Sequence, residues 1–238
     1  MKRNMIITVA LLGIIAPATL IVAHQDDPKI KDRQPAVKAD AYRADRDFGK
    51  ERSLGFSSEN VQLKSWLPLS EFGTNADNGN DCWGYVSPSG REYALVGTYD
   101  GTGIVEITEP GNAQVIALLN GNDSLWRDIK TYGTYMYCVS EGGGGIQVFN
   151  LADIDNGNVQ TLNSAGSGST HNVVIDTESG FLYRTGGVAD GMYIYSLANP
   201  AAPVQVGSWT DRYIHDAQVV TYTDGPFSGR QIAFCCAG

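Results

Sequence analysis

Hydrophobic and polar residues alternate over short runs in this chain, a pattern that predicts β-strands. The clearest example lies in residues 126–150, where β-branched and aromatic residues fill Ile129–Ser140 around a turn at Tyr132-Gly133-Thr134. Four consecutive glycines, Gly142–Gly145, then supply the positive-φ positions that a tight hairpin needs, and Gly145–Asn150 alternates again. Apolar residues in these segments lack the spacing of three and four that a helix requires. The pattern therefore predicts paired strands.

The same unit recurs at a constant interval. The dipeptides that open four successive copies start 44 residues apart, at Trp83, Arg127, His171 and His215. The second strands recur with small insertions between them, at Gly103–Thr108, Gly145–Asn150 and Gly191–Ser196. A period in the forties with several short strands per unit is typical of β-propeller blades. The predicted fold class is all-β, a β-propeller with blades of 44 residues.

The repeats also predict how far the folded part extends. Strand character begins near Val61, three blades follow, and the fourth starts at His215 and stops at Gly238 after its second strand. A closed propeller needs at least four blades, and an incomplete one leaves an exposed sheet edge. We therefore expect an incomplete β-propeller over residues 61–238, truncated after three and a half blades.

The segment before the propeller has two parts. Residues 1–23 carry Lys2 and Arg3, then an uncharged apolar run up to Ala23, and this order predicts a secretory signal peptide. The run is long enough that an uncleaved anchor is the alternative. Residues 24–60 are charge-dense and poor in large aliphatic side chains, so we expect a disordered or briefly helical spacer. The predicted location is extracellular or in the cell envelope.

Composition and charge limit the classes of molecule that we expect the chain to bind. The chain has 238 residues, 42% of them hydrophobic, and a formal net charge of −9. An acidic chain without a basic stripe argues against nucleic acid as a partner, and it leaves membrane contact to the anchor or uncleaved signal.

The four cysteines lack metal-binding spacing, and export permits a disulfide, with Cys82 and Cys138 as one possible pair.

Several long segments are similar to a known family. They are SWLPLSEFG, NDCWGYVSPSGREYALVGTYDGTG, SLWRDIKTYG, VSEGGGGIQVF, YSLANPAAPVQVGSW, DRYIHDAQVVTY and IAFCCAG. Together they resemble the choice-of-anchor B family, which is built on LVIVD-type β-propeller repeats, over about Val61–Gly238. The resemblance implies a bacterial protein that is exported to the surface or secreted. It implies no settled biochemical activity.

The equal phase of the opening dipeptides predicts a candidate site. Positions in the same phase of successive blades lie on one ring around the propeller axis. If the dipeptides lead into the innermost strands, they surround one mouth of the central channel, a default position for a ligand. The residues of this ring are Trp83, Arg127, Asp128, His171, Asn172, His215 and Asp216. A second interpretation is structural, because buried His and Asp side chains often tie one blade to the next.

The ring supports two functions of different classes. The first is a binding module for an extracellular protein or a small-molecule or glycan ligand, with no cofactor and no catalysis of its own. The second is a metal-dependent hydrolase or lyase, in which His171, His215 and Asp216 hold a divalent metal. In a metal-free variant of that enzyme, His215 acts as a base beside Asp216 or Asp128, and Arg127 binds an anionic substrate. The sequence favours the binding module.

Overall fold

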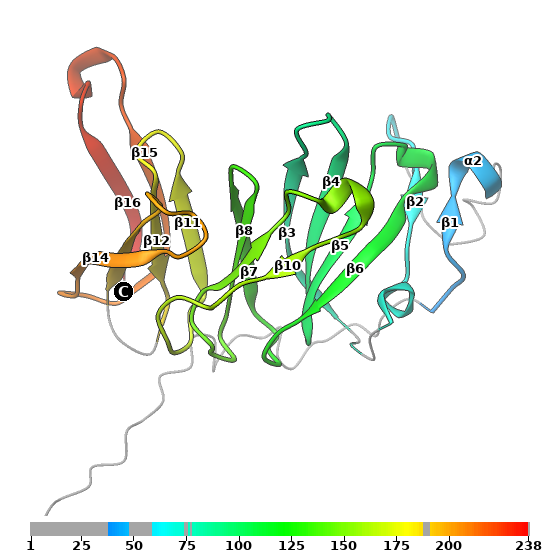
Figure 1. Cartoon of the computed structure of the whole chain (residues 1–238), viewed down its shortest axis with the longest axis horizontal. Helices are drawn as coiled ribbons and strands as arrows, with labels where there is room; N and C mark the ends of the chain where they lie inside the picture. Colours follow the sequence, from blue (N-terminus) through cyan, green and yellow to red (C-terminus); the bar gives the residue numbers. More distant parts are fainter. Residues whose placement is uncertain (1–37, 48–58, 74–75, 77, 188–190, 238) are drawn as a thin grey trace, which may run out of the picture.

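The computed structural model describes residues 38–47, 59–73, 76, 78–187 and 191–237. Within these ranges the fold is all-β, with three four-stranded antiparallel sheets between two two-stranded sheets. Each four-stranded sheet is a meander, because strands next to one another in the sequence pair with one another. Figure 1 shows the sheets following one another in chain order, from β1–β2 to β15–β16. The prediction of small antiparallel sheets is confirmed, and the described sheets do not close into a ring.

We call each four-stranded sheet a blade. The first blade consists of β3 (Gly79–Val86), β4 (Glu92–Thr98), β5 (Gly101–Glu106) and β6 (Gln114–Asn120). The second consists of β7 (Arg127–Tyr132), β8 (Tyr135–Ser140), β9 (Gln147–Asn150) and β10 (Gln160–Thr161). The third consists of β11 (Asn172–Asp176), β12 (Phe181–Thr185), β13 (Met192–Ser196) and β14 (Val204–Trp209). The last sheet pairs β15 (Ile214–Thr221) with β16 (Gln231–Ala237).

The remaining elements are short. A two-stranded sheet joins β1 (Tyr42–Arg43) to β2 (Ser65–Trp66), and the single turn α2 (Ala44–Asp47) follows β1. Among the described residues, the 3₁₀ turns are η2 (Leu69–Phe72), η3 (Pro110–Asn112), η4 (Ile154–Asn156) and η5 (Gly225–Phe227). None of the helices within the described ranges has both the length and the apolar character needed to cross a lipid bilayer.

Glycines close the predicted turns. Gly133 has a φ of 56° between β7 and β8, and Gly145 has a φ of 71° before β9. These values lie in the left-handed region that favours glycine. Side chains are also excluded at Gly145 by space, because an added Cβ would lie 2.6 Å from the carbonyl oxygen of Ala165. The glycine run therefore turns the chain where it passes closest to the loop that leads toward β11.

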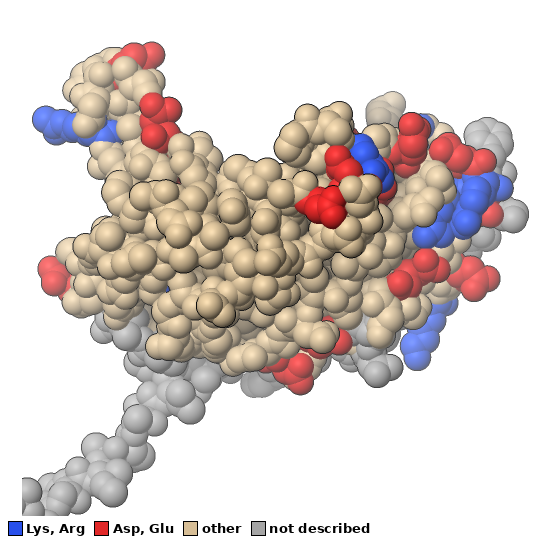
Figure 2. Space-filling view, viewed as in Figure 1, with Lys and Arg blue, Asp and Glu red and all other residues tan. Residues whose placement is uncertain are grey.

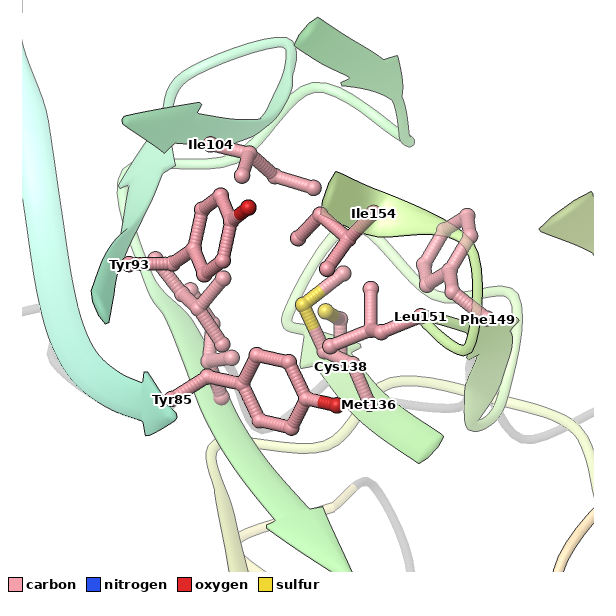
Figure 3. Close-up of a cluster of buried hydrophobic side chains, with 10 residues drawn as sticks. Tyr85, Tyr93, Ile104, Met136, Cys138, Phe149, Leu151 and Ile154 are labelled. Carbon is pink, nitrogen blue, oxygen red and sulfur yellow. The ribbon is translucent and has the colours of Figure 1, made fainter. Parts of the chain in front are cut away.

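Hydrophobic cores form where one sheet packs on the next. The first blade packs on the second through a cluster that includes Tyr93, Ile104, Cys138, Phe149 and Leu151 (Figure 3). Further clusters join the second blade to the third and the third to β15–β16. Each large side chain buried in this way contributes roughly 1.5–3 kcal/mol to the free energy of folding. Face-to-face packing of sheets therefore holds the first strands, β3, β7, β11 and β15, beside one another.

Part of the predicted spacer is folded against the first blade. Tyr42 and Ala44 are buried, and Arg43 donates hydrogen bonds to the carbonyl oxygen of Ala113 and to Glu71. The sequence gives no sign of this docking, because the segment has few large apolar residues and its contacts are made by Tyr42 and by an arginine that finds a distant carbonyl. The predicted signal peptide, residues 1–23, lies outside the described residues.

All four cysteines are free thiols. Cys138 is fully buried in the first core cluster, where Thr102 Oγ1 donates a hydrogen bond to its Sγ at 3.5 Å. Cys82 is exposed on β3, so the Cys82–Cys138 pair that the sequence allowed is not formed. Burial raises the pKa of the Cys138 thiol to about 12.

Charged side chains are unevenly spread over the face shown in Figure 2. They gather at the end that carries β1, β2 and α2 and at the tip of the β15–β16 hairpin, while much of the surface between is uncharged. Both signs occur at each of these ends. No large field of one sign therefore covers this face.

Candidate functional site at the start of the inner strands

Two histidines and one aspartate meet where β11 and β15 begin. His171 directly precedes β11, and His215 and Asp216 are the second and third residues of β15. The two imidazole centroids lie 4.2 Å apart. One ligand atom from each of the three residues lies within 4.8 Å of the others. The sequence predicted this convergence from the common phase of the blades.

The backbone around Gly186 brings the two histidines together. Gly186 follows β12, and its N–H donates to the carbonyl oxygen of Ile214 at 2.7 Å. His171 N–H donates to the carbonyl oxygens of Thr185 and Gly186, each at 3.1 Å, and Thr185 Oγ1 donates to the carbonyl oxygen of His215. Gly186 has a φ of 67°, and an added Cβ there would overlap the Cβ of His171. Glycine at this position is therefore required for the approach of β11 and β15.

A carboxylate from the second blade contacts His171. Nδ1 of His171 lies 2.7 Å from Oε1 of Glu141, which follows the last residue of β8. Both side chains are largely buried, and the ring of Trp126 meets that of His171 edge-on at 6.0 Å. Glu141 and Trp126 therefore fix the plane of the His171 imidazole and direct Nε2 away from Glu141.

His215 and Asp216 form the more exposed half of the cluster. Nδ1 of His215 lies 2.6 Å from Oδ2 of Asp216, and Oδ1 of Asp216 lies 3.8 Å from Nε2 of His171. The Asp216 side chain is 46% exposed, whereas that of His171 is 14% exposed. The cluster thus combines the largely buried imidazole of His171 with the more exposed side chains of His215 and Asp216.

Sequence analysis did not find Glu141. A signal was present, because β7 and β8 form an antiparallel hairpin in which Arg127 pairs with Ser140. The end of a second strand must therefore lie beside the start of the first strand of the same blade. Residues just after β8 belong to the same end of the molecule as the opening dipeptides. Strand periodicity does not single out Glu141, because this residue lies between the end of β8 and the glycine turn.

Asp128 and Asn172, which the sequence placed in the ligand-binding ring, tie blades together. Asp128 Oδ2 accepts a hydrogen bond from the backbone N–H of Val173 at 2.8 Å and another from Asn172 Nδ2 at 2.7 Å. Asn172 Oδ1 in turn accepts from the backbone N–H of Ala217 at 3.1 Å. The same tie occurs one blade earlier, where Asp81 Oδ2 accepts from the backbone N–H of Ile129. These acceptors satisfy N–H groups of the next inner strand.

Arg127 is buried inside the fold. Its guanidinium donates to the carbonyl oxygens of Thr98 and Asn122 and to Gln147 Oε1, at 3.3, 2.8 and 3.3 Å. Only 2% of its surface is exposed. Loss of hydration lowers the pKa of this guanidinium. Arg127 therefore joins strand ends of the first and second blades and does not reach the histidine cluster.

Trp83 lies apart from the cluster, on β3. Its indole Nε1 donates to Thr131 Oγ1 at 3.1 Å, and the ammonium of Lys130 lies 4.5 Å from the ring centroid. Lys130 also forms ion pairs with Asp128 and Asp81. Trp83 thus takes part in a cation–π contact with Lys130 across the inner strands of the first two blades.

Of the seven residues in the predicted ring, the structure brings three into one cluster. Those three are His171, His215 and Asp216. Their acidic neighbour Glu141 makes the site rich in ligands for a cation. The other four predicted residues make contacts between neighbouring blades, as the structural interpretation of the sequence allowed.

Comparisons with known proteins give structural likeness without a family. No family model and no curated protein matches the chain. A periplasmic gluconolactonase from Pseudomonas aeruginosa is similar in structure, with a TM-score of 0.49 and 12% identity, over 65% of this chain and 49% of that one. Hydrazine synthase from Kuenenia stuttgartiensis has a TM-score of 0.41 and 8% identity, over 71% of this chain and 46% of that one. The chain spans about half the length of either protein.

Proposed function

We propose that this protein is an exported β-propeller module, secreted or held at the bacterial cell surface, which binds an extracellular ligand through the His171–His215–Asp216 cluster and performs no catalysis of its own. The ligand is an extracellular protein, a small molecule or a glycan. As part of this proposal, each propeller blade spans 44 residues, and the chain is related to the choice-of-anchor B proteins that its sequence resembles. Export rests on the signal-like residues 1–23.

One observation carries the binding proposal. In the inner strands, Asp128 and Asn172 are occupied by hydrogen bonds to the next strand, whereas His171, His215 and Asp216 turn toward one another. Convergent polar side chains at the end of a rigid β-scaffold are the usual setting of a binding site. The cores on both sides of β11 hold the scaffold in place, so little conformational entropy would be lost on binding.

Retention on arrays tests this proposal. The full chain, labelled with a fluorophore, is applied to printed glycans and to purified extracellular proteins, and small carboxylic acids are screened by thermal shift. We expect at least one probe to bind, and His171→Ala and His215→Ala to weaken that binding tenfold or more. Asp224→Asn, an exposed change in the β15–β16 turn, serves as the control. Equal binding by wild type and both histidine variants would contradict the proposal.

The cluster also favours a second candidate, a metal-dependent hydrolase or lyase. Two imidazoles and one carboxylate within 4.8 Å are a donor set that catalytic metal sites use, with a further position left for water. The test is turnover of chromogenic esters and phosphate esters by the full chain supplied with Zn²⁺. Turnover that disappears in His171→Ala and His215→Ala would favour the enzyme over the binding module.

A further inference from the structure

We propose that His171, His215 and Asp216 bind one divalent transition-metal ion, that Glu141 positions His171 for it, and that the ion holds the ligand through a carboxylate oxygen. This inference rests on the proposed function, because it names the group that contacts the ligand. It adds a residue, Glu141, that the opening dipeptides do not include.

The donor set selects the class of ion. Imidazole nitrogen suits zinc, copper, iron and nickel, whereas calcium and magnesium take oxygen ligands almost exclusively. Two nitrogens and one oxygen give three protein ligands, which is the number found in zinc sites that keep a position open. A cationic ligand is repelled by the ion, and a ligand without a lone pair gains nothing from the open position. A carboxylate supplies both the missing donor and a compensating negative charge.

The spacing of the donors requires a small closing movement. Two ligands bonded to one zinc ion at about 2.1 Å in a tetrahedron lie about 3.4 Å apart. Oδ1 of Asp216 and Nε2 of His171 are already 3.8 Å apart, and all three donors lie within 4.8 Å. His215 and Asp216 have partly exposed side chains, so rotation about their χ angles brings them closer without moving β15. Metal binding then replaces the contact between His215 Nδ1 and Asp216 Oδ2.

Glu141 supplies the positioning contact. A metal-bound imidazole usually places its second nitrogen on a carboxylate, which fixes the tautomer and the ring orientation. Glu141 Oε1 lies 2.7 Å from His171 Nδ1, and the Glu141 side chain is 9% exposed. Because this contact sets Nε2 as the metal ligand, Glu141 acts through His171 and does not touch the ion.

Asp216 makes different contacts from the residues at the equivalent position of the earlier blades. Asp128 and Asn172 occupy the same phase on β7 and β11, and each accepts a backbone N–H from the next inner strand. Asp216 occupies that phase on β15, and its two oxygens face the imidazoles of His215 and His171. In the earlier blades this side chain accepts a backbone N–H, whereas on β15 it faces two imidazole nitrogens that can bind a metal.

Titration of the metal-free full chain tests the site. Zn²⁺ is added in competition with a chromophoric chelator, and Co²⁺ is added separately to record its visible absorption, which reports the number and type of ligands. We expect one equivalent of metal per chain. His171→Ala and His215→Ala should weaken Zn²⁺ binding at least a hundredfold, and Glu141→Gln about 10–100-fold. Asp216→Asn should change the Co²⁺ spectrum, and Asp224→Asn should leave both readouts unchanged.

Four outcomes separate the claims. Less than half an equivalent of Zn²⁺, or equal affinity in both histidine variants, would overturn the metal site. Normal Glu141→Gln affinity and spectrum would overturn the role of Glu141, and this near-isosteric variant is checked for folding by its urea midpoint. The array experiment is then repeated after EDTA treatment. Retained ligand binding without metal would overturn the ligand-holding role and leave the binding module standing. Stoichiometric metal without any array ligand would overturn the binding module together with the ligand-holding role and leave the metal site standing.

Discussion

Replacing Asp128 by alanine removes the side chain that ties the second blade to the third. Asp128 Oδ2 accepts hydrogen bonds from Val173 N–H and Asn172 Nδ2, and Oδ1 accepts from Ile129 N–H and from Lys130 Nζ. Asp128 is 6% exposed and Val173 is fully buried, so water cannot replace these contacts without opening the inner strands. We therefore expect Asp128→Ala to destabilise the folded chain strongly.

The magnitude follows from the donors left behind. A buried donor without a partner costs about 1–3 kcal/mol, and Val173 N–H is left in this state, whereas Ile129 N–H keeps its second acceptor, Asp81 Oδ2. Asn172 and Lys130 are partly exposed and recover some hydration, so we count about 1 kcal/mol for the pair. Relief of the repulsion between Asp128 and Asp81 offsets a small part of this cost. The expected net loss is about 3 kcal/mol of unfolding free energy.

Urea unfolding followed by far-ultraviolet circular dichroism measures the loss. With a slope of about 2 kcal/mol/M, the expected midpoint of Asp128→Ala falls by about 1.5 M. Asp224→Ala, an exposed aspartate on the β15–β16 turn, should change the unfolding free energy by less than about 0.5 kcal/mol. A midpoint within 0.3 M of wild type, at an unchanged slope, is the result that would refute the reasoning (about 0.6 kcal/mol at that slope).

Three further predictions use other buried groups. Arg127→Ala should lower the unfolding free energy by about 2 kcal/mol, because it removes the donor from the buried Thr98 carbonyl oxygen and one contact each from Asn122 and Gln147. An unchanged urea midpoint would contradict this. Burial and the nearby Asp128 raise the pKa of Asp81 from 3.8 to about 6. The protonated Asp81 side chain therefore contributes fully to stability below pH 3.8, and this contribution is lost as the pH rises through 6. The difference in unfolding free energy between wild type and Asp81→Asn should change between pH 4 and 7, and a constant difference would exclude the raised pKa. A thiol reagent should label three of the four cysteines in the folded chain and Cys138 only after unfolding, because that thiol is buried with a pKa raised to about 12; rapid labelling of four thiols would show the core to be open.

Local patterns predicted the sheets because strand periodicity and turn glycines act over a few residues. The alternating run Gly145–Asn150 contains β9, Gln147–Asn150, and the predicted turn at Gly133 separates β7 from β8. The Asn, Asp and Gly residues between positions 75 and 81 are typical of a loop, yet β3 begins at Gly79. Asn, Asp and Gly are poor strand formers by themselves, and β3 is extended there by pairing with β4 across a bulge between Gly79 and Cys82.

The candidate site was predictable only in part, for a physical reason. A common phase places residues on one ring, and it correctly brought His171 to His215 and Asp216. Phase does not say whether a polar side chain faces its neighbouring strand or the axis. Asp128 faces the neighbouring strand, and this choice depends on which backbone N–H groups lie unpaired beside it in three dimensions. Contacts such as Glu141–His171 join different blades and carry no periodic signal.

The ties between inner strands give the array of blades a polarity. In each of the three ties the acceptor side chain belongs to the earlier blade and the backbone N–H to the later one, as in Asp81 to Ile129, Asp128 to Val173 and Asn172 to Ala217. During synthesis, a finished blade therefore already displays the acceptor that sets the register of its successor. A blade that packed out of register on the preceding one would leave that carboxylate or amide without its donor.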